Sequence, residues 1–455
     1  MRSEALKAAA RGVRALSRRA GRGGGTTLPG RLLLRADPDA LATMGRRLDA
    51  GSAVISATNG KTTTAAMVAA ILERAGRPLV HNRAGSNMSW GVATALLDAG
   101  RERGQLGLLE VDEAWLPQVA RALCPHTYLL ANLFRDQLDR YGELETLADR
   151  WAELVAGEAG RARFVLNADD PLVADLGRGR EDSVVYFGVE DDSQALAGLG
   201  HAADSKHCRN CGSAYAYATV LLGHLGHYRC PSCGRTRPAP AVSATRIELQ
   251  GMTGARMELS TPAGSLDLVL PLPGLYNVYN AVGACALALE LGATLEDVRD
   301  ALQGFGGAFG RVETIPVAGR PVSILLIKNP AGATEVLRTL ALEDGALDLW
   351  LALNDRIADG RDVSWIWDAD FELLAGRVRR ATCSGTRAEE LALRLKYAGL
   401  DAEIVVERDL ERSLDSAVAA GRAQGRPLFA LPTYTAMLDL HDLLSDRGLA
   451  ARWAA

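Results

Sequence analysis

The sequence predicts an α/β protein with two sheet-containing domains, the first of which carries a cysteine-rich insertion. From about residue 50, apolar segments typical of buried strands alternate with helical segments, which predicts βαβ units around a mainly parallel sheet. This alternation stops near residue 190, and a second one starts near Ile315. A length of 455 residues is enough for two or three domains. We therefore place a domain boundary between residues 312 and 320.

The composition is that of a globular protein and argues against a nucleic-acid-binding protein and a membrane-spanning protein. Hydrophobic residues make up 48% and charged residues 23% of the chain, and the net charge is −4. A net negative charge gives no overall basic field for nucleic acid, so we expect no nucleic-acid partner. Apolar runs fall short of the roughly 18 residues that span a bilayer, so we expect no transmembrane segment.

The first 23 residues are basic, with seven arginines and lysines against one glutamate. The continuous apolar core of a secretory signal is lacking. A transit peptide, a basic amphipathic helix near anionic lipid or on a partner, and a solvated helix before a glycine-rich stretch all fit this composition. We expect the solvated helix and treat residues 1–45 as a separate basic N-terminal segment.

The stretch "VISATNGKTTT" predicts a phosphate-binding loop. Val54 and Ile55 end a strand, and Lys61 begins a helix that ends near Gly76. A glycine turn between a strand and a helix presents backbone N–H groups and the positive end of the helix dipole to phosphate. The lysine can reach the β- and γ-phosphates and the next hydroxyl can bind Mg²⁺. The candidate nucleotide-binding residues are Thr58, Asn59, Gly60, Lys61, Thr62 and Thr63.

The segment "LGLLEVDE" predicts the acid that holds the metal. It is a buried-type strand followed by Glu110, Asp112 and Glu113. An acid at the carboxyl end of a parallel strand, beside a phosphate loop, is where Mg²⁺ is held. We favour Glu110 because it ends the apolar run, and for the other two acids a solvated acidic turn is the competing interpretation.

Four motifs in order resemble the ATP-dependent Mur ligases, which form amide bonds on peptidoglycan precursors through an acyl phosphate. These are "ATNGKTT", "NLFRDQLDRYG", "VLNADDP" and "FGRVE". The resemblance implies a central P-loop ATPase domain followed by a Rossmann-like α/β C-terminal domain. It makes Lys61 and Thr62 the phosphate-binding pair, Glu110 the Mg²⁺ ligand and Arg311 an ATP contact. It also places Asn167 and Asp170 near the nucleotide, although Asp170 followed by proline is equally typical of a helix start.

The chain departs from the Mur ligase pattern at three places. Gln137 stands where the family usually has a histidine that binds a second Mg²⁺, and no lysine follows where the family often has a carbamylated one. Only about 50 residues precede the loop, so the domain that grips the UDP-sugar precursor in most Mur ligases is not expected here. We assign residues 46–314 to the central domain and residues 315–455 to the C-terminal domain.

A zinc ribbon is predicted between about residues 200 and 240. Four cysteines form two C-x₂-C pairs separated by 18 residues, and each pair is followed by glycine. Four thiolates suit tetrahedral Zn²⁺ and leave no open position, so the predicted role is structural. The nearby His207, His224 and His227 are expected to be solvated loop residues. The predicted zinc ligands are Cys208, Cys211, Cys230 and Cys233.

The segment "LALNDRIADGRDVSWIWD" places several acids after a predicted strand, where ligands bind in α/β sheets. Lys328, Asn329 and Pro330 end another strand and could touch nucleotide or substrate. An amide-forming enzyme needs a nitrogen source, and none of the lone cysteines lies on the strand-to-helix elbow of a glutaminase nucleophile. Ammonia from another protein, or an amino acid, is therefore expected.

This segment, the short N-terminal part, the four cysteines and the glutamine at position 137 resemble the MurT-like branch of the Mur ligases. The resemblance implies a GatD-type class I glutaminase partner and amidation of the α-carboxyl of D-glutamate in lipid II. It also implies a C-terminal aspartate that completes the partner's Cys–His pair, for which we choose Asp355 over Asp359 and Asp362. The expected cofactors are ATP, Mg²⁺ and Zn²⁺, and the expected location is cytoplasmic, at the inner membrane face where a lipid-linked substrate is met.

Two other functions stay open from the sequence. A Mur or folylpolyglutamate type of ligase would add an amino acid and need no glutaminase. A nucleotide-gated zinc-ribbon binding protein would bind nucleotide without making an amide bond. Few aromatic residues and modest basic charge around the cysteines argue against a nucleic-acid ribbon.

Overall fold

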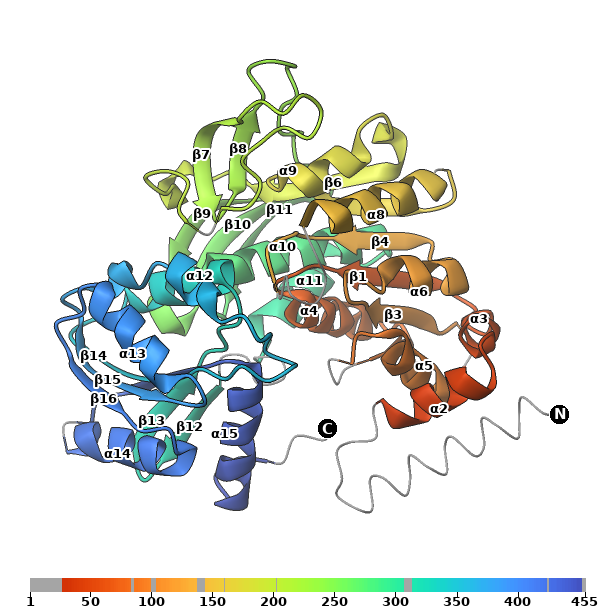
Figure 1. The fold of residues 1–455 in the computed structure, drawn as a ribbon. Helices are drawn as coiled ribbons and strands as arrows, with labels where there is room; N and C mark the ends of the chain where they lie inside the picture. The colour runs from red at the N-terminus through yellow and green to blue at the C-terminus, as the bar shows by residue number, and fades with distance from the viewer. Residues whose placement is uncertain are drawn as a thin grey trace.

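The computed structural model describes residues 27–82, 86–99, 104–136, 144–158, 160–201, 203–306, 313–423 and 425–451. Most of the basic N-terminal segment, Gln137 and Arg311 lie outside these residues. Two sheets divide the described chain, and a hairpin projects from the first (Figure 1). Among the described residues, no helix is both long and apolar enough to cross a membrane.

The first sheet is mainly parallel. Its strands are β1 (Ser52–Ser56), β2 (Leu79–His81), β3 (Leu106–Glu110), β4 (Thr127–Leu130), β5 (Arg163–Asn167), β6 (Val184–Val189), β9 (Val242–Leu249), β10 (Ala255–Thr261) and β11 (Gly264–Leu270). Within the described residues their order is β11-β10-β9-β6-β5-β4-β1-β3-β2, and the pairs of β10 with β9 and with β11 are antiparallel while the other pairs are parallel. Every residue of β1 and β3 is buried, as expected for central strands covered on both faces.

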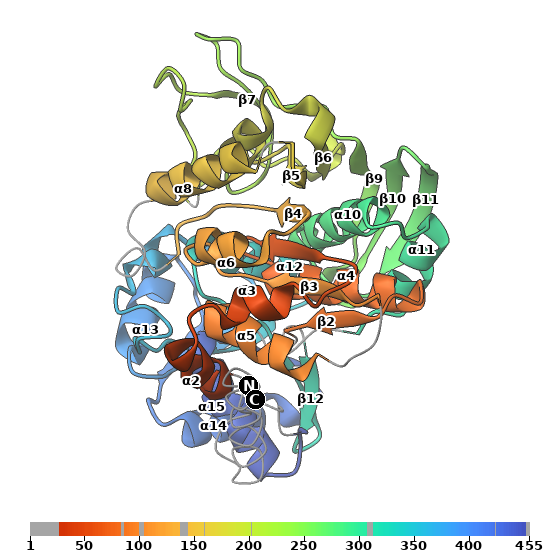
Figure 2. The same ribbon diagram turned by 90° about the vertical axis from the view of Figure 1, so that its right-hand side faces the viewer.

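Helices cover both faces of this sheet. They are α2 (Leu28–Ala36), α3 (Ala40–Gly45), α4 (Lys61–Arg74), α5 (Ser89–Asp98), α6 (Leu116–Leu123), α8 (Leu144–Gly157), α9 (Pro171–Ala174), α10 (Leu275–Glu290) and α11 (Leu295–Gln303). One hydrophobic core joins the sheet to α4, α10 and α11, and another joins it to α3, α5, α6 and α8 (Figure 2). The alternation of strands and helices in the sequence thus produces the predicted layered α/β arrangement.

The second sheet is formed by β12 (Glu313–Val317), β13 (Arg320–Ile324), β14 (Leu347–Ala352), β15 (Val378–Ser384), β16 (Glu403–Val406) and β17 (Leu428–Pro432). The order is β12-β13-β17-β14-β15-β16, and all pairs except β12 with β13 are parallel. Its helices are α12 (Pro330–Leu340), α13 (Ala388–Tyr397), α14 (Leu410–Arg422) and α15 (Tyr434–Asp446). Parallel pairing brings the carboxyl ends of β14, β15 and β17 to one edge, so the loops after them are neighbours.

The insertion forms an antiparallel hairpin, β7 (Ala216–Leu222) and β8 (Leu225–Arg229). The segment that follows the hairpin is tied to the first domain by buried Asp169, which accepts hydrogen bonds from Arg237 at 2.5 Å and from the Tyr279 hydroxyl at 2.7 Å. The hairpin also contacts the second domain, since Arg338 of α12 donates to the Leu221 carbonyl at 2.8 Å. The insertion therefore touches both domains (Figure 1).

Candidate active site

The loop from Ala57 to Gly60 joins β1 to α4 and opens a helix N-terminus to a ligand. Gly60 has φ +82°, a conformation that favours glycine, and a side chain there would lie 2.0 Å from the Asn280 amide oxygen. Ala57 is buried in the hydrophobic core, so its methyl group packs into the domain. The Ala57 methyl group is thus compatible with a loop that binds phosphate through its backbone.

Lys61 is buried at the start of α4 and bonded to two groups. Its ammonium group lies 2.8 Å from the Glu113 carboxylate and also donates to the Ala57 carbonyl. Burial would lower the pKa of Lys61, but Glu113, Asp112 and Glu110 together outweigh it and raise that pKa. Burial would likewise raise the pKa of Glu113, yet Lys61 and then Lys328 lower it. A charged lysine is therefore held where β- and γ-phosphates would bind.

Thr62 and Glu110 meet at the end of the loop, as the sequence predicts for a magnesium site. The parallel register pairs Ile55 with Glu110, and the Thr62 hydroxyl donates to the Glu110 carboxylate at 3.0 Å. Asn82 fixes the Glu110 backbone through hydrogen bonds of 2.9 and 2.8 Å. A hydroxyl and a carboxylate side by side are oxygen donors of the kind that Mg²⁺ prefers, so these residues fit that ion.

The acids after Glu110 are not the solvated turn that was the competing interpretation. Asp112 is 9% exposed and Glu113 is 8% exposed. Burial first, and then Glu113, raises the pKa of Asp112. The sequence pattern could not reveal the pairing of Glu113 with Lys61, because Glu113 lies beyond the strand, where the loop path decides its direction.

Polar side chains from both domains surround the loop. Asn59 accepts and donates hydrogen bonds with Asn329, at 2.9 and 3.3 Å, and its backbone N–H donates to Asn132 at 2.9 Å. Lys328 donates to the Thr58 carbonyl at 3.1 Å and pairs with the Asp136 carboxylate. The second domain therefore contacts the phosphate loop directly. The sequence indicates Lys328 and Asn329 as candidate contacts but not their partners, and no local pattern assigns a role in the site to Asn132.

A cavity of about 110 Å³ adjoins the start of α4. Its polar lining includes the predicted residues Asn59, Gly60 and Thr63. The apolar lining includes Leu222 and Leu225 from the tip of the hairpin. A concave, mostly apolar lining with a few amide and hydroxyl groups is typical of small-molecule sites. The remaining lining residues are Asn132, Phe134, Leu272, Tyr276, Asn277, Tyr279, Asn280, Leu325, Leu326, Lys328, Ala331, Gly332, Glu335 and Val336.

The two described residues that were predicted near the nucleotide from outside the phosphate loop do not line this cavity. Asp170 is fully buried and caps α9 by accepting from the Leu172 N–H at 2.9 Å, and its other oxygen accepts from the Leu133 N–H at 2.9 Å. Asn167 is 1% exposed and accepts from the Asp169 N–H. Both shape the backbone near the site. The predicted ATP contact Arg311 lies outside the described residues.

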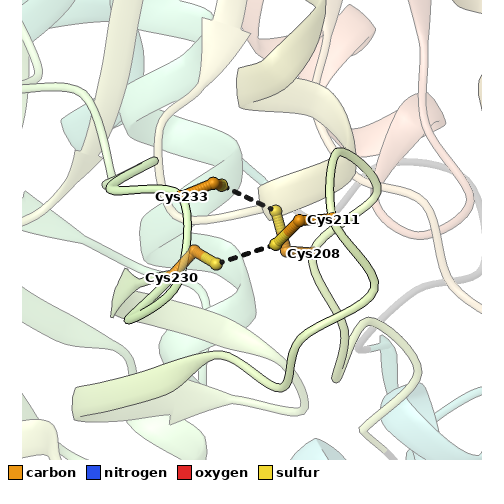
Figure 3. Close-up of side chains that lie close together, drawn as sticks. All are labelled: Cys208, Cys211, Cys230 and Cys233. Carbon is orange, nitrogen blue, oxygen red and sulfur yellow. Dashed lines mark hydrogen bonds between the residues drawn. The ribbon is translucent and has the colours of Figure 1, made fainter.

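The four cysteines converge as their spacing predicts (Figure 3). Their sulfurs all lie within 4.8 Å of one another, with Cys208 and Cys233 at 3.6 Å and Cys211 and Cys230 at 3.4 Å. Tetrahedral Zn²⁺ with bonds of about 2.3 Å places sulfurs about 3.8 Å apart, so the cluster fits a metal. Gly212 and Gly234 follow the pairs with φ +75° and +74°.

Among the described residues the cluster that could hold a metal consists of the four cysteines, and two of the three nearby histidines differ from expectation. His227 is half-buried in β8, and its Nε2 lies 2.9 Å from the Val189 carbonyl oxygen. His224 is fully buried, not solvated. Its ring packs on Phe134 with 4.6 Å between ring centres, and its Nε2 lies 3.5 Å from the Asp170 carboxylate. The hairpin turn carries this ring into the first domain, which periodicity in a short insertion could not indicate.

The three candidate acids of the second domain have different surroundings. Asp355 faces the surface, where it accepts from the Thr386 hydroxyl at 2.8 Å and from Arg387 at 3.2 Å. The hydrogen bond from Thr386, and then that from Arg387, lower the pKa of Asp355, so it is ionised at neutral pH. Asp359 is 7% exposed and its carboxylate accepts a hydrogen bond from the Thr435 N–H. The Asp362 carboxylate accepts a hydrogen bond from the Ser364 N–H. Hydrogen bonds lower the pKa of Asp362 as they do that of Asp355, so both of these acids are accessible and charged, and they line different cavities, whereas Asp359 is buried.

Fold and site define a phosphate-loop protein of the α/β class in which a second α/β domain meets the loop. A family model described as the Mur ligase middle domain matches residues 55–288, and one described as MurT ligase C-terminal matches residues 326–437. The chain belongs to the MurT family of the Mur ligases.

Named relatives cover nearly the whole chain. The lipid II isoglutaminyl synthase (glutamine-hydrolyzing) subunit MurT of Staphylococcus aureus is 31% identical over 422 residues, which cover 92% of this chain and 93% of that one. The subunit of the same name from Streptococcus pneumoniae is 32% identical over 435 residues and 94% of each chain.

Solved structures share the fold at lower identity. A pseudomurein peptide ligase type C from Methanothermus fervidus superposes with a TM-score of 0.67 at 20% identity, covering 88% of this chain and 79% of that one. MurF ligase from Thermotoga maritima, solved in complex with ADP, gives a TM-score of 0.63 at 14% identity, covering 90% of this chain and 84% of that one.

Proposed function

We propose that the chain is the ligase subunit of a lipid II isoglutaminyl synthase, which converts the α-carboxyl of D-glutamate in the lipid II stem peptide to an amide. The observation that carries this proposal is the separation of two sites on one chain. Lys61, Thr62 and Glu110 form a phosphate site between the domains, and Asp355 lies charged on the surface of the second domain. A ligase fed with ammonia by a partner needs both sites.

Lys61 and the N-terminus of α4 would bind the phosphates of ATP, and the adjoining cavity would take the base and sugar. Thr62 and Glu110 would hold Mg²⁺, which would neutralise charge on the phosphate oxygens. On nucleotide binding, Lys61 exchanges part of its bond with Glu113 for the phosphate oxygens. We assign Arg311 and the loop near Asn167 and Asp170 to the surroundings of the nucleotide on resemblance alone.

The substrate carboxylate would attack the γ-phosphorus of ATP to give an acyl phosphate and ADP. Lys61 stabilises the negative charge that is transferred, because it is fixed and charged before the reaction begins. Ammonia then attacks the acyl carbon, phosphate leaves, and a proton is lost to give the amide. Lys328, which contacts the phosphate loop from the second domain, would fix the position of the second domain relative to that loop.

The cysteines would hold one structural Zn²⁺, since a closed Cys₄ set offers the metal no open position. The partner would be a GatD-type class I glutaminase whose histidine Asp355 orients. Because lipid II is anchored in a membrane, the complex would work in the cytoplasm at the inner membrane face. We propose residues 46–314 and 315–455 as its two domains.

The test is amide formation on lipid II by the purified chain with ATP and three nitrogen sources. We expect product with ammonium alone, none with glutamine alone, and product with glutamine when the glutaminase is added. Lys61→Ala should abolish each reaction, because the phosphate site loses its fixed charge. Ligation of a free amino acid would instead establish the Mur or folylpolyglutamate type, and ATP binding without ligation would establish a binding protein.

A further inference from the structure

A polar wall separates two cavities in the second domain. The outer cavity includes Asp355 and Thr435, with Arg356, Ile357, Ala358, Arg361 and Arg387 around them. The inner cavity, of about 80 Å³, includes Asp359 and Lys328, with Arg135, Asp136, Asn329, Pro330, Asp362, Ser364, Trp365 and Asp368 around them. Thr435 lines the outer cavity and Asp359 the inner one, and these two side chains touch.

The wall consists of three buried side chains joined by hydrogen bonds. Asn354 donates to the Thr435 hydroxyl at 3.0 Å, that hydroxyl donates to the Asp359 carboxylate, and the Thr435 N–H donates to the same carboxylate at 2.8 Å. The exposed fractions are 4%, 8% and 7% for Asn354, Thr435 and Asp359. In the described part of the chain no cation pairs with Asp359, and a buried carboxylate without a cationic partner is costly to keep, so a role beyond packing is expected.

The outer side of the wall is linked to Asp355 and the inner side to the phosphate loop. On the outer side, Asn354 accepts from the Thr386 N–H at 3.1 Å, and the Thr386 hydroxyl donates to Asp355 at 2.8 Å. On the inner side, Lys328 lines the cavity and donates to the Thr58 carbonyl of the phosphate loop at 3.1 Å. The wall is thus the shared boundary between the partner-facing acid and the phosphate site.

We propose that Asn354, Thr435 and Asp359 form a gate through which ammonia passes from the outer cavity to the inner one. This inference rests on the proposed function, because ammonia is the product that a glutaminase would release beside Asp355. Ammonia has three N–H donors and one lone pair. It can therefore accept the Thr435 hydroxyl hydrogen and donate to Asp359, replacing the bond between them without leaving either group unpaired.

The inner cavity has an acidic lining that suits ammonia arriving through the gate. Asp136, Asp359, Asp362 and Asp368 give it four carboxylates against Arg135 and Lys328. Carboxylates on this side can accept hydrogen bonds from ammonia and attract ammonium by charge, and both effects oppose escape to solvent. Arg135 of the first domain pairs with Asp368 of the second at 3.2 Å and so helps to close the cavity at the domain boundary.

The test compares Thr435→Val and Asp359→Asn with the exposed control Asp401→Asn, each in complex with the glutaminase. Glutamate released and amide formed are measured together, with and without an enzyme that removes free ammonia from bulk solution. We expect the original complex to resist the scavenger. In the two wall variants the scavenger should lower the rate of glutamine-driven amidation about tenfold. A misplaced contact in the path of a reactant can reduce the rate by at least that factor.

Ammonium-driven amidation and nucleotide affinity separate this role from a structural one. Both should be unchanged in Thr435→Val, which keeps the size of the side chain and removes only its hydroxyl. The gate is excluded if the original complex is already sensitive to the scavenger, or if Thr435→Val resists it equally. Failure to form amide from any nitrogen source would overturn the proposed function itself, which is a distinguishable result.

Discussion

Lys328 Nζ lies 3.1 Å from the Thr58 carbonyl oxygen and thereby joins the second domain to the phosphate loop of the first. The same ammonium group pairs with Asp136, which follows β4 in the first domain. One lysine therefore fixes two loops that surround the expected position of the reacting phosphate. Its position at the carboxyl end of β13 follows from the parallel sheet, since the loops after parallel strands meet at the ligand-binding edge.

Lys328→Ala should lower amide formation about tenfold with ammonium and with glutamine alike, because the phosphate loop loses a contact that sets its position. Steady-state rates with each nitrogen source, at saturating ATP, measure this. Lys396→Ala removes an exposed lysine of α13 and serves as the control. A loss confined to the glutamine-driven reaction would show that Lys328 acts on ammonia transfer instead.

Glu113→Gln should make nucleotide binding sensitive to alkaline pH. In the original protein the carboxylates raise the pKa of Lys61 despite its burial, so the lysine stays charged below its ordinary value of 10.5 and loses its charge only above the raised value. Glu113 is the largest of the opposing charges. Without the Glu113 charge, the effect of burial is opposed less, and the pKa of Lys61 falls.

The measurement is the ADP dissociation constant between about pH 6 and pH 9.5 by calorimetry, a range chosen to lie below the ordinary pKa of lysine. We expect a flat profile for the original protein and weakening affinity at the alkaline end for Glu113→Gln. Glu153→Gln, an exposed substitution on α8, is the matched control. Parallel profiles for all three proteins would mean that Glu113 does not set the charge of Lys61.

Much of the site could be predicted because it depends on local pattern. Strand, glycine turn and helix placed Lys61 and Thr62, and a buried strand ending in an acid placed Glu110 beside them. The spacing of the cysteines was enough to bring four sulfurs together. Each of these depends on backbone geometry that a short stretch of sequence determines.

The remainder depends on contacts between segments far apart in the chain. Asn59 and Asn329 are 270 residues apart, and no local pattern pairs them. The tip of the hairpin, with Leu222 and Leu225, reaches the cavity only because the insertion folds back across the domain boundary. Asp170 illustrates the opposite case, since an acid followed by proline predicts a helix start from the local sequence and its carboxylate caps α9.

Asp355→Asn should spare amidation with ammonium and lower amidation with glutamine by about 100-fold or more, as expected when an acid that orients a catalytic histidine is neutralised. The side chain is half-buried at the surface and accepts hydrogen bonds from Thr386 and Arg387, so the substitution should not unfold the domain. Asp362→Asn is the control, because it neutralises a neighbouring acid in the same segment. Equal glutamine-driven rates for Asp355→Asn and the original complex would remove Asp355 from the partner's site.

Cys230→Ser should release the metal from the cysteine cluster and also weaken nucleotide binding. The cluster lies at the base of β7 and β8, whose tip supplies Leu222 and Leu225 to the cavity beside the phosphate loop. If the hairpin loses its fixed position, the affinity for ADP should fall about tenfold, which corresponds to about 1.4 kcal/mol of binding free energy.

Zinc content by mass spectrometry and ADP affinity by calorimetry test this pair of effects on the same preparation. Cys124→Ser removes an exposed cysteine far from the cluster in sequence and should change neither value. If Cys230→Ser loses zinc while ADP affinity stays the same, the metal stabilises the ribbon alone. If both fall together, the hairpin is a wall of the nucleotide cavity whose position depends on the metal, because no cysteine of the cluster lines that cavity itself.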